Sequence, residues 1–380
     1  MDADVGVVGL GSMGSAALWQ VAGRGARVIG FDQFEPGHAF GAGHGESKIF
    51  RTAYAEGPEY VPMLRAALPL WRQLEEETGR PLLTMSGGLM IGSLDHYFIS
   101  SALRSARDLG LLHRVYDAAE AERRWPQLKL QPDEHVLWEP RAGVLRPELA
   151  VVAAVDRARE LGADVVTGVR VQSVVDMGDH VEIRTTDRTW RVGRLVLAVG
   201  SWIGKVLGTA ELPFWVERQV QVWFPIEEPD LYHPERFGIF IRALDEWSTW
   251  YGFPSLDGRT IKVAFHHNNG RRSDPDQLDR EVHASDIEPL REIALANLRW
   301  LRPEVARTQV CMYCNTPDEH FVIGPLPGSP RIVLGGPMAG HGFKFSPVVG
   351  AIAADLVVEG RTAYDIGPFD PGRLPALAAV

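Results

Sequence analysis

The stretch Val5-Gly6-Val7-Val8-Gly9-Leu10-Gly11-Ser12-Met13-Gly14 places the pattern G-x-G-x-x-G directly after a short apolar run. We expect a strand at 5–8, a helix at 15–22 and a second strand at 28–32, which together form a βαβ unit of a parallel sheet. The first glycine makes the turn, the second lets the backbone approach a pyrophosphate, and the third packs the helix on the strand. Asp32 follows Gly9 by 23 positions and is positioned to accept a hydrogen bond from a ribose hydroxyl. The predicted dinucleotide site comprises Gly9, Gly11, Ser12, Met13, Gly14 and Asp32, and the alternative is a tight glycine turn without a ligand.

Two further glycine-containing runs indicate which dinucleotide binds. A reductase that draws electrons from NAD(P)H through FAD would carry a second fingerprint of this kind, and the sequence has none. Residues 194–202 (RLVLAVGSW) resemble the mid-chain strand and turn of FAD-binding oxidoreductases. The run 335–342 precedes an expected helix at 346–359, whose positive N-terminal end would face the pyrimidine part of a flavin. Each run alone is also typical of a glycine-rich loop, but the three in this order favour FAD.

The chain changes character after Gly87, where short alternating or aromatic runs are bounded by Pro, Gly and Asp. These runs predict antiparallel strands of a second domain at 88–91, 136–138, 219–226, 237–242, 248–253 and 260–266. Helices are expected at 60–78 and 147–161, and further strands at 164–174, 181–185, 195–199 and 331–336. We therefore predict an α/β fold (α+β overall), in which a Rossmann-type FAD-binding domain is interleaved with an antiparallel-sheet substrate domain. The predicted bounds are 1–86, 146–215 and 322–380 for the FAD-binding domain, and 87–145 and 216–321 for the substrate domain.

The composition excludes several classes of protein. The 380 residues are 45% hydrophobic and 23% charged with a net charge of −10, so nucleic acid is not an expected partner. No run of about 18 apolar residues is present, so no membrane-spanning helix is expected. Cys311 and Cys314 cannot build a disulfide framework and lack the partners of a zinc site, so no metal is expected. The acidic residues before the first apolar run and the absence of a peroxisomal ending lead us to expect a cytoplasmic protein.

Six strings carry a resemblance that covers essentially the whole chain. With them the chain resembles the monomeric sarcosine oxidase and N-methyltryptophan oxidase family of amine-oxidising flavoproteins. Several of the strings are unusual, so chance matching is not expected. The resemblance implies FAD as cofactor, a small amine with a carboxylate and oxygen as reaction partners, and a monomer. The strings are 44–51 (HGESKIFR), 54–57 (YAEG), 250–254 (WYGFP), 310–313 (VCMY), 317–321 (PDEHF) and 340–346 (GHGFKFS).

The resemblance also implies how the cofactor is held. Cys311 matches the residue joined by a thioether to the 8α-methyl group of the flavin, a role that requires a thiolate. A small buried hydrophobe is the alternative for Cys311 and the expectation for Cys314, and the residues alone do not choose between the two. Gly340 and Gly342 belong to the glycine run expected beside the cofactor. Lys48 stands where these enzymes usually have arginine beside the flavin, so the charge is kept while the bidentate geometry is lost.

Three cationic residues are implied to serve the substrates. Arg51 and Lys344 resemble the pair that binds the substrate carboxylate, and Lys344 is also expected to contact the cofactor. Lys262 alternates with apolar residues on an expected strand, so an inward-pointing ammonium there needs partners. In the family the matching lysine lies near the flavin N(5) and helps oxygen become superoxide. The alternatives are surface charges for the pair and a strand edge for Lys262.

Histidine and tyrosine side chains are implied to line the substrate pocket. His266 matches an active-site histidine that contacts substrate, and His267 is expected to face the other way on the strand. An apparent extra residue before Gly270 leaves His267 open as the active-site histidine. Tyr251 and Tyr313 match aromatic hydroxyl groups near the substrate, for which core tyrosines are an almost equal alternative.

The resulting hypothesis is an FAD-dependent oxidase of N-methyl (secondary) amino acids such as sarcosine. A neutral amine would give a hydride to the flavin, the imine would hydrolyse to an aldehyde and an amino acid, and oxygen would become hydrogen peroxide. Alternatives are an oxidase of a bulkier N-alkyl, cyclic or sugar-modified amino acid, a flavin dehydrogenase that uses a carrier protein, and a flavin-binding protein without catalysis. Residues 237–270 are expected to decide the substrate.

Overall fold

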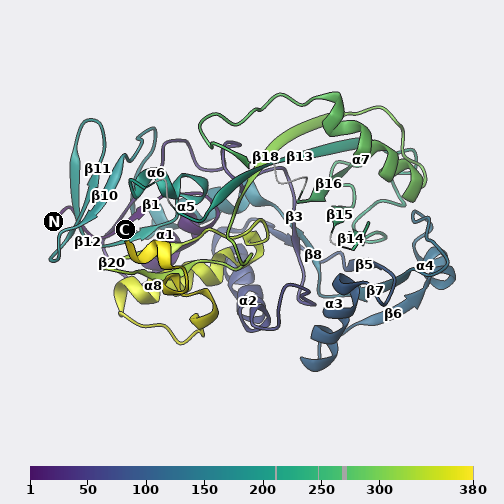
Figure 1. Cartoon of the computed structure of the whole chain (residues 1–380), viewed down its shortest axis with the longest axis horizontal. Helices are drawn as coiled ribbons and strands as arrows, with labels where there is room; N and C mark the ends of the chain where they lie inside the picture. Colours follow the sequence, from purple (N-terminus) through teal and green to yellow (C-terminus); the bar gives the residue numbers. More distant parts are fainter. Residues whose placement is uncertain (210–211, 247, 268–271, 380) are drawn as a thin grey trace.

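The computed structural model describes residues 1–209, 212–246, 248–267 and 272–379, which form two large sheets and a small one (Figure 1). The first large sheet has eight strands and lies on the left in Figure 1, and the second has nine and lies on the right. The three-stranded sheet, in the order β3-β8-β4, lies near the middle of this view. Its strands are β3 (Lys48–Phe50), β4 (Leu83–Thr84) and β8 (Gly143–Leu145).

The first sheet is built around the predicted βαβ unit. β1 (Ala3–Val8) lies between β2 (Val28–Phe31) and β12 (Thr189–Leu197) and pairs with both in parallel. Parallel pairing continues from β2 to β9 (Asp164–Val166) and from β12 to β20 (Ser329–Gly335). All residues of β2 and all but one of β1 are buried, as expected of strands covered on both faces. Antiparallel strands complete the sheet: β10 (Ser173–Asp176), β11 (Val181–Arg184) and β19 (Ile323–Leu326).

Five α-helices cover the first sheet or lie beside it. α1 (Ser12–Gly23) packs against α5 (Pro147–Glu160) and α8 (Ser346–Val358). The approach of α1 to α8 is close, because a Cβ added at Gly350 would lie 2.6 Å from the backbone of Ala16. α2 (Tyr60–Thr78) packs against α8 and has the predicted bounds, since Gly79 ends it in a left-handed conformation with φ of 66°. The short α6 (Ile203–Val206) follows β12.

The second sheet has the order β17-β13-β16-β15-β14-β5-β7-β6, with β18 paired to β13. Its pairings are antiparallel, as predicted, except that β14 and β5 are parallel. Helices α3 (Tyr97–Asp108), α4 (Ala118–Arg124) and α7 (Ala284–Asn297) accompany it. The strands are β5 (Gly88–Gly92), β6 (Arg114–Asp117), β7 (His135–Glu139), β13 (Trp215–Pro225), β14 (Ile239–Ala243), β15 (Thr249–Gly252), β16 (Thr260–His266), β17 (Arg272–Ser273) and β18 (Arg307–Asn315).

The structure differs from the prediction at several elements, and the helices α3, α4 and α7 were not predicted. The strand expected at 164–174 is two strands, β9 and β10, because the chain turns at Gly168 with φ of 71°. β18 was not predicted, although it pairs with β13 along its whole length. The chain passes between the two sheets several times, and the division into two domains at the predicted bounds stays a prediction.

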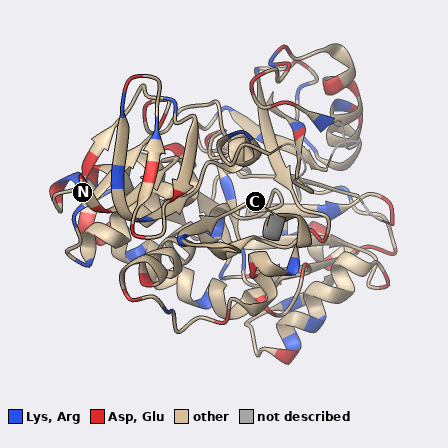
Figure 2. Ribbon diagram, turned by 60° about the vertical axis from the view of Figure 1, so that its left-hand side comes forward, with Lys and Arg blue, Asp and Glu red and all other residues tan. Residues whose placement is uncertain are grey.

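Charged residues of both signs are distributed along the chain. Figure 2 shows Lys and Arg residues scattered among Asp and Glu residues in this view. None of the described helices is long and apolar enough to cross a membrane. Within the described ranges, His, Cys, Asp and Glu side chains form no group of three placed to hold a metal ion.

Candidate active site

The glycine turn has the geometry that a dinucleotide requires. Gly9 has φ of 87°, and a Cβ on Gly14 would lie 1.7 Å from the Gly9 carbonyl oxygen, so neither position accepts a larger residue without strain. A Cβ added at Gly11 would meet no atom within 4 Å, because this residue faces open space at the start of α1. The Asp32 carboxylate accepts hydrogen bonds from the backbone N–H groups of Leu10 (2.7 Å) and Phe34 (2.9 Å), which fix it at the end of β2.

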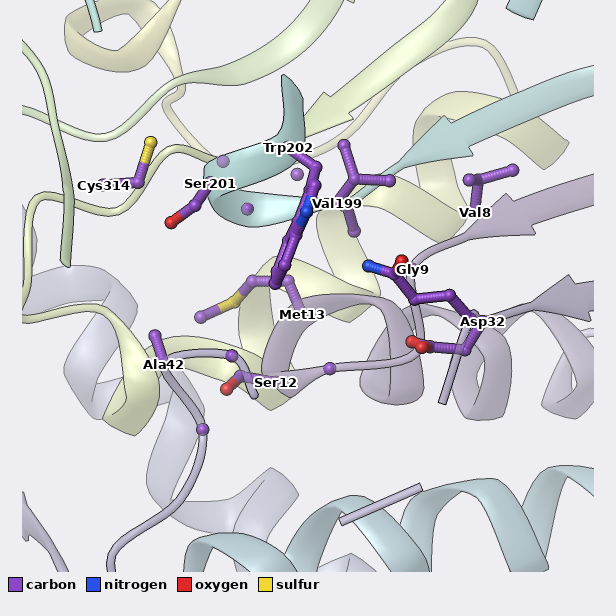
Figure 3. Close-up of a pocket in the computed structure, with 18 of the residues that line it drawn as sticks. Val8, Gly9, Ser12, Met13, Asp32, Ala42, Val199, Ser201, Trp202 and Cys314 are labelled. Carbon is purple, nitrogen blue, oxygen red and sulfur yellow. The ribbon is translucent and has the colours of Figure 1, made fainter. Parts of the chain in front are cut away.

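One cavity of about 370 Å³ brings the three glycine-containing runs together (Figure 3). Its size suits a cofactor pocket, for which volumes of roughly 300–1,000 Å³ are usual. In Figure 3, Asp32 and Cys314 lie at opposite ends of the cavity, with Trp202 between them. The N-terminal end of α1 faces it, which suits a pyrophosphate. Eight predicted cofactor residues line it: Gly9, Gly11, Ser12, Met13, Asp32, Lys48, Gly340 and Gly342.

The other three predicted cofactor residues are not among the lining residues. Gly14 packs beneath the turn against Gly9. Cys311 is fully buried, and its Sγ lies 3.7 Å from the carbonyl oxygen of Ala42, which does line the cavity. Lys344 instead lies beside Tyr54, and its ammonium donates a hydrogen bond to the Tyr54 hydroxyl group at 3.2 Å.

The two cysteines have opposite environments. Burial alone would raise the pKa of Cys311, but the positive charges of Lys48 and His44 outweigh it and lower this pKa to about 6. Burial raises the pKa of Cys314 to about 12, so this thiol stays protonated although it lines the cavity. His44 is fully buried, its charge acts on the Cys311 thiol, and neither of its ring nitrogens has a hydrogen-bond partner among the described residues. Sequence reasoning did not single out His44, and its place in the string 44–51 was the available signal.

Lys262 points inward from β16 and has partners. Its ammonium donates hydrogen bonds to the carbonyl oxygens of Gly45 (2.7 Å) and Ser47 (2.6 Å). It also lies 4.2 Å from the ring centre of Phe253. Burial, followed by repulsion from Lys48, holds the pKa of Lys262 well below its usual value. The buried lysine therefore holds the segment that leads into β3, and the charge of Lys48, the first residue of β3, acts on Cys311.

The cationic groups of Arg51 and Lys344 both lie over the aromatic ring of Tyr54. The guanidinium carbon of Arg51 is 4.5 Å and the ammonium of Lys344 is 5.0 Å from the ring centre of Tyr54. Arg51 is ion-paired with Glu56. Burial alone would raise the pKa of Glu56, but Arg51, together with His341 and Lys344, holds it at about 2. The structure therefore gathers two buried cations around one carboxylate.

A group of tyrosine and histidine side chains forms the second part of the candidate active site. Tyr313 is buried and Tyr251 is half-buried, and burial raises the pKa of both hydroxyl groups above the usual value. The rings of His266 and His267 lie 5.8 Å and 5.6 Å from that of Tyr313. Burial, followed by repulsion from His267, holds the pKa of His266 well below its usual value, so this imidazole is neutral.

The expectation that His267 faces away from His266 is wrong. β16 ends at His266, and His267 has φ of 58°, so strand alternation does not continue. The two rings lie 4.3 Å apart. The extra residue expected before Gly270 falls in 268–271, outside the described residues.

A buried carboxylate beside this group was missed by sequence reasoning. Glu217 accepts hydrogen bonds from Gln219 (2.8 Å) and Asn315 (2.8 Å), and its Oε2 lies 3.1 Å from Nδ1 of His267. Glu217 lies just before the strand expected at 219–226, and its partners His267 and Asn315 are distant in sequence, so no local signal marked it.

Comparison with known proteins places the chain in a family. The family model described as FAD dependent oxidoreductase matches residues 4–356. A monomeric sarcosine oxidase of Streptomyces avermitilis is 40% identical in an alignment of 380 positions that covers 99% of each chain. An N-methyl-L-tryptophan oxidase of Salmonella arizonae is 33% identical over 98% of this chain and 99% of its own length.

Solved structures agree on the fold. NikD, described as an unusual amino acid oxidase essential for nikkomycin biosynthesis, superposes with a TM-score of 0.84 at 27% identity over 97% of each chain. L-proline dehydrogenase from P. horikoshii has a TM-score of 0.84 at 20% identity, over 99% of this chain and 98% of its own. The resemblance, the Rossmann-type fold and FAD as cofactor are thus confirmed. This chain belongs to the family of FAD-dependent oxidoreductases that includes the monomeric sarcosine oxidases and the N-methyl-L-tryptophan oxidases.

Proposed function

We propose that the chain is an FAD-dependent oxidase of N-methyl amino acids such as sarcosine, and that Cys311 carries the flavin. The observation that carries the proposal is the pair of buried cations, Arg51 and Lys344, on Tyr54. Together they offer a guanidinium fork and an ammonium to one carboxylate, and Glu56 is the counterion of Arg51.

The same charges favour the reactive form of the amine. A substrate held by its carboxylate at Arg51 and Lys344 has its nitrogen near two cations, which disfavour an ammonium. A neutral nitrogen has the lone pair that stabilises a developing iminium. When bound, FAD supplies the acceptor for a hydride and the route to hydrogen peroxide. Tyr251, Tyr313 and the neutral His266 form the wall that orients the rest of the substrate.

Oxygen is the proposed electron acceptor because of Lys262. An ammonium fixed by two carbonyl oxygens and placed near a second cation, Lys48, provides positive charge where oxygen acquires negative charge. No reorganisation is needed for this charge to act, since both hydrogen bonds are already made.

Cys311 is the proposed attachment point because it is the thiol with thiolate character at neutral pH. Lys48 and His44 supply the positive charge, and Ala42 connects the thiol to the cavity. Acid precipitation tests the bond: the yellow colour should stay with the wild-type pellet and with Cys314→Ala, and should be released from Cys311→Ala. Colour released from all three proteins would contradict the covalent bond.

A monomer in the cytoplasm is the proposed state. Several relatives carry the word monomeric in their names, and both cysteines of this chain are free thiols. The net charge of −10 supports the absence of a nucleic-acid partner.

A bulkier N-methyl amino acid is the second candidate substrate, supported by the relative described as N-methyl-L-tryptophan oxidase. Peroxide formation should be measured with N-methylglycine, N-methyl-L-tryptophan and glycine at equal concentration. A higher kcat/KM for N-methylglycine supports the first candidate, and the reverse order supports the second. Peroxide from glycine alone would contradict both.

A further inference from the structure

A continuous path of hydrogen bonds leads from Lys344 to the protein surface. The Lys344 ammonium donates to the backbone carbonyl of His341 at 2.6 Å and to Tyr54 Oη at 3.2 Å. Tyr54 Oη lies 2.6 Å from Nδ1 of His341. On the other side of the imidazole, Nε2 lies 3.2 Å from the carbonyl oxygen of Glu319, in an exposed segment.

The donor and acceptor of each hydrogen bond can be assigned from the Glu319 carbonyl group, at the surface end of the path. The Glu319 carbonyl can only accept, so Nε2 of His341 donates to it. Burial lowers the pKa of His341 to about 3, so the ring is neutral and has a single N–H, and Nδ1 must accept. Tyr54 therefore donates its O–H to Nδ1, which leaves its lone pairs for Lys344. This assignment of the tautomer rests on the hydrogen-bond network.

We infer that Tyr54 and His341 are positioning residues that hold the Lys344 ammonium protonated and aim its remaining N–H at the substrate carboxylate. An ammonium has three N–H donors. Among the described residues, two are taken by the His341 carbonyl and Tyr54, so one is left for the substrate. The inference rests on the proposed role of Lys344 and extends it to two side chains that have no role in the reaction so far.

The electrostatics show why Lys344 needs this support. Lys344 is 4% exposed, and burial followed by repulsion from Arg51 lowers its pKa to about 7. Glu56 is the charged group that opposes this effect, and Tyr54 and His341 add two neutral acceptors. Only the ammonium form, which predominates below this pKa, attracts a carboxylate. Carboxylate affinity should therefore fall as pH rises through the pKa of Lys344, and loss of an acceptor should move the fall to lower pH.

Tyr60 offers a matched control for Tyr54. Both tyrosines are buried, their rings lie 5.2 Å apart, and each hydroxyl is bonded to Nδ1 of a histidine. The partner of Tyr60 is His320, at 2.7 Å, and this pair makes no hydrogen bond to Lys344. Tyr54→Phe and Tyr60→Phe each remove a hydroxyl oxygen from a tyrosine–histidine pair. Only Tyr54→Phe also removes a hydrogen bond of the Lys344 ammonium.

The experiment uses the holoenzyme and has two arms. Binding of acetate, a carboxylate without an amine, is followed by the flavin absorbance between about pH 6 and pH 9, on either side of the Lys344 pKa. Steady-state kcat and KM for N-methylglycine are measured over the same range. For Tyr54→Phe we expect the acetate Kd and the KM at pH 8 to rise roughly tenfold, as for loss of a hydrogen bond to a charged group, with kcat within about twofold. The pH midpoint should also move down, and Tyr60→Phe should match the wild type.

Two variants of His341 separate positioning from general damage. The amide oxygen of His341→Asn can replace Nδ1 as acceptor for Tyr54, whereas His341→Leu cannot. We expect His341→Asn to retain most of the acetate affinity and His341→Leu to resemble Tyr54→Phe. Equal Kd, KM and midpoint in Tyr54→Phe and Tyr60→Phe would overturn the inference. Failure of N-methylglycine to react in the wild type would instead contradict the proposed substrate, while the acetate arm would still test the positioning of Lys344.

Discussion

The Lys262 ammonium lies 2.6 Å from the carbonyl oxygen of Ser47, and this bond joins the second sheet to the loop that carries Lys48. If its charge serves oxygen, Lys262→Met should slow reoxidation of the reduced enzyme by roughly 100-fold, the size of effect seen when a preorganised electrostatic group is removed. Anaerobic reduction by substrate should change much less. Stopped-flow absorbance measures the two half-reactions separately.

Lys129→Met is the control for this change, because the Lys129 ammonium donates to the carbonyl oxygen of Leu295 and does not line the cavity. It should leave both half-reactions unaltered. An unchanged reoxidation rate in Lys262→Met would remove oxygen activation from the account.

Arg51→Gln should lower kcat/KM for N-methylglycine by roughly 10- to 100-fold, because one charge-assisted hydrogen bond to the carboxylate is lost. Loss of the Glu56 ion pair accompanies the change, so the flavin content of the variant must be checked first. Arg24→Gln, which breaks the ion pair with Asp355 on another face, is the control. Equal kinetics of the two variants would argue against a carboxylate at Arg51.

Covalent attachment should depend on pH through Cys311. The thiolate is the nucleophile and the pKa is lowered to about 6, so the rate of attachment of FAD to apoprotein should rise as pH increases through about 6 and level off above pH 7. Lys48→Met should move this rise to higher pH, because the charge that lowers the Cys311 pKa most is removed. Retention of flavin after acid precipitation at timed points measures the rate. A rise that stays near pH 6 in Lys48→Met would contradict the assigned cause.

Glu217→Gln should destabilise the protein. Its buried carboxylate accepts hydrogen bonds from Gln219 and Asn315 and contacts His267, and a neutral amide presents N–H groups to some of these donors. Roughly 1–3 kcal/mol of the free energy of unfolding should be lost, measured by denaturant unfolding of the holoenzyme. Glu235→Gln, at an exposed side chain, should have no effect. Equal stability of the two variants would show that Glu217 is not held as described.

Local signals in the sequence predicted the parts of the fold that depend on local backbone geometry. The glycine turn at 9–14 and the helix α2 are set by conformational limits and by the spacing of apolar residues, so both were predicted. β18 was missed because a strand next to β13 is defined by pairing between residues about 90 positions apart, which no local pattern reports.

The same limit applies to the site. Lys344 lies 293 positions after Arg51, and only the family resemblance brought these two residues together before the structure did. His267 was misplaced because alternation along a strand says nothing about a left-handed residue at its end. Glu217 was invisible because a glutamate on a strand gives no sign of buried partners.

The most direct test of the central claim is anaerobic mixing of the holoenzyme with N-methylglycine, followed by admission of air. The account predicts that the visible absorbance of the oxidised flavin is lost on mixing, that it returns with oxygen, and that hydrogen peroxide forms in equal amount to the flavin reoxidised in the first turnover. Absorbance that stays unchanged with N-methylglycine and with N-methyl-L-tryptophan would contradict the account.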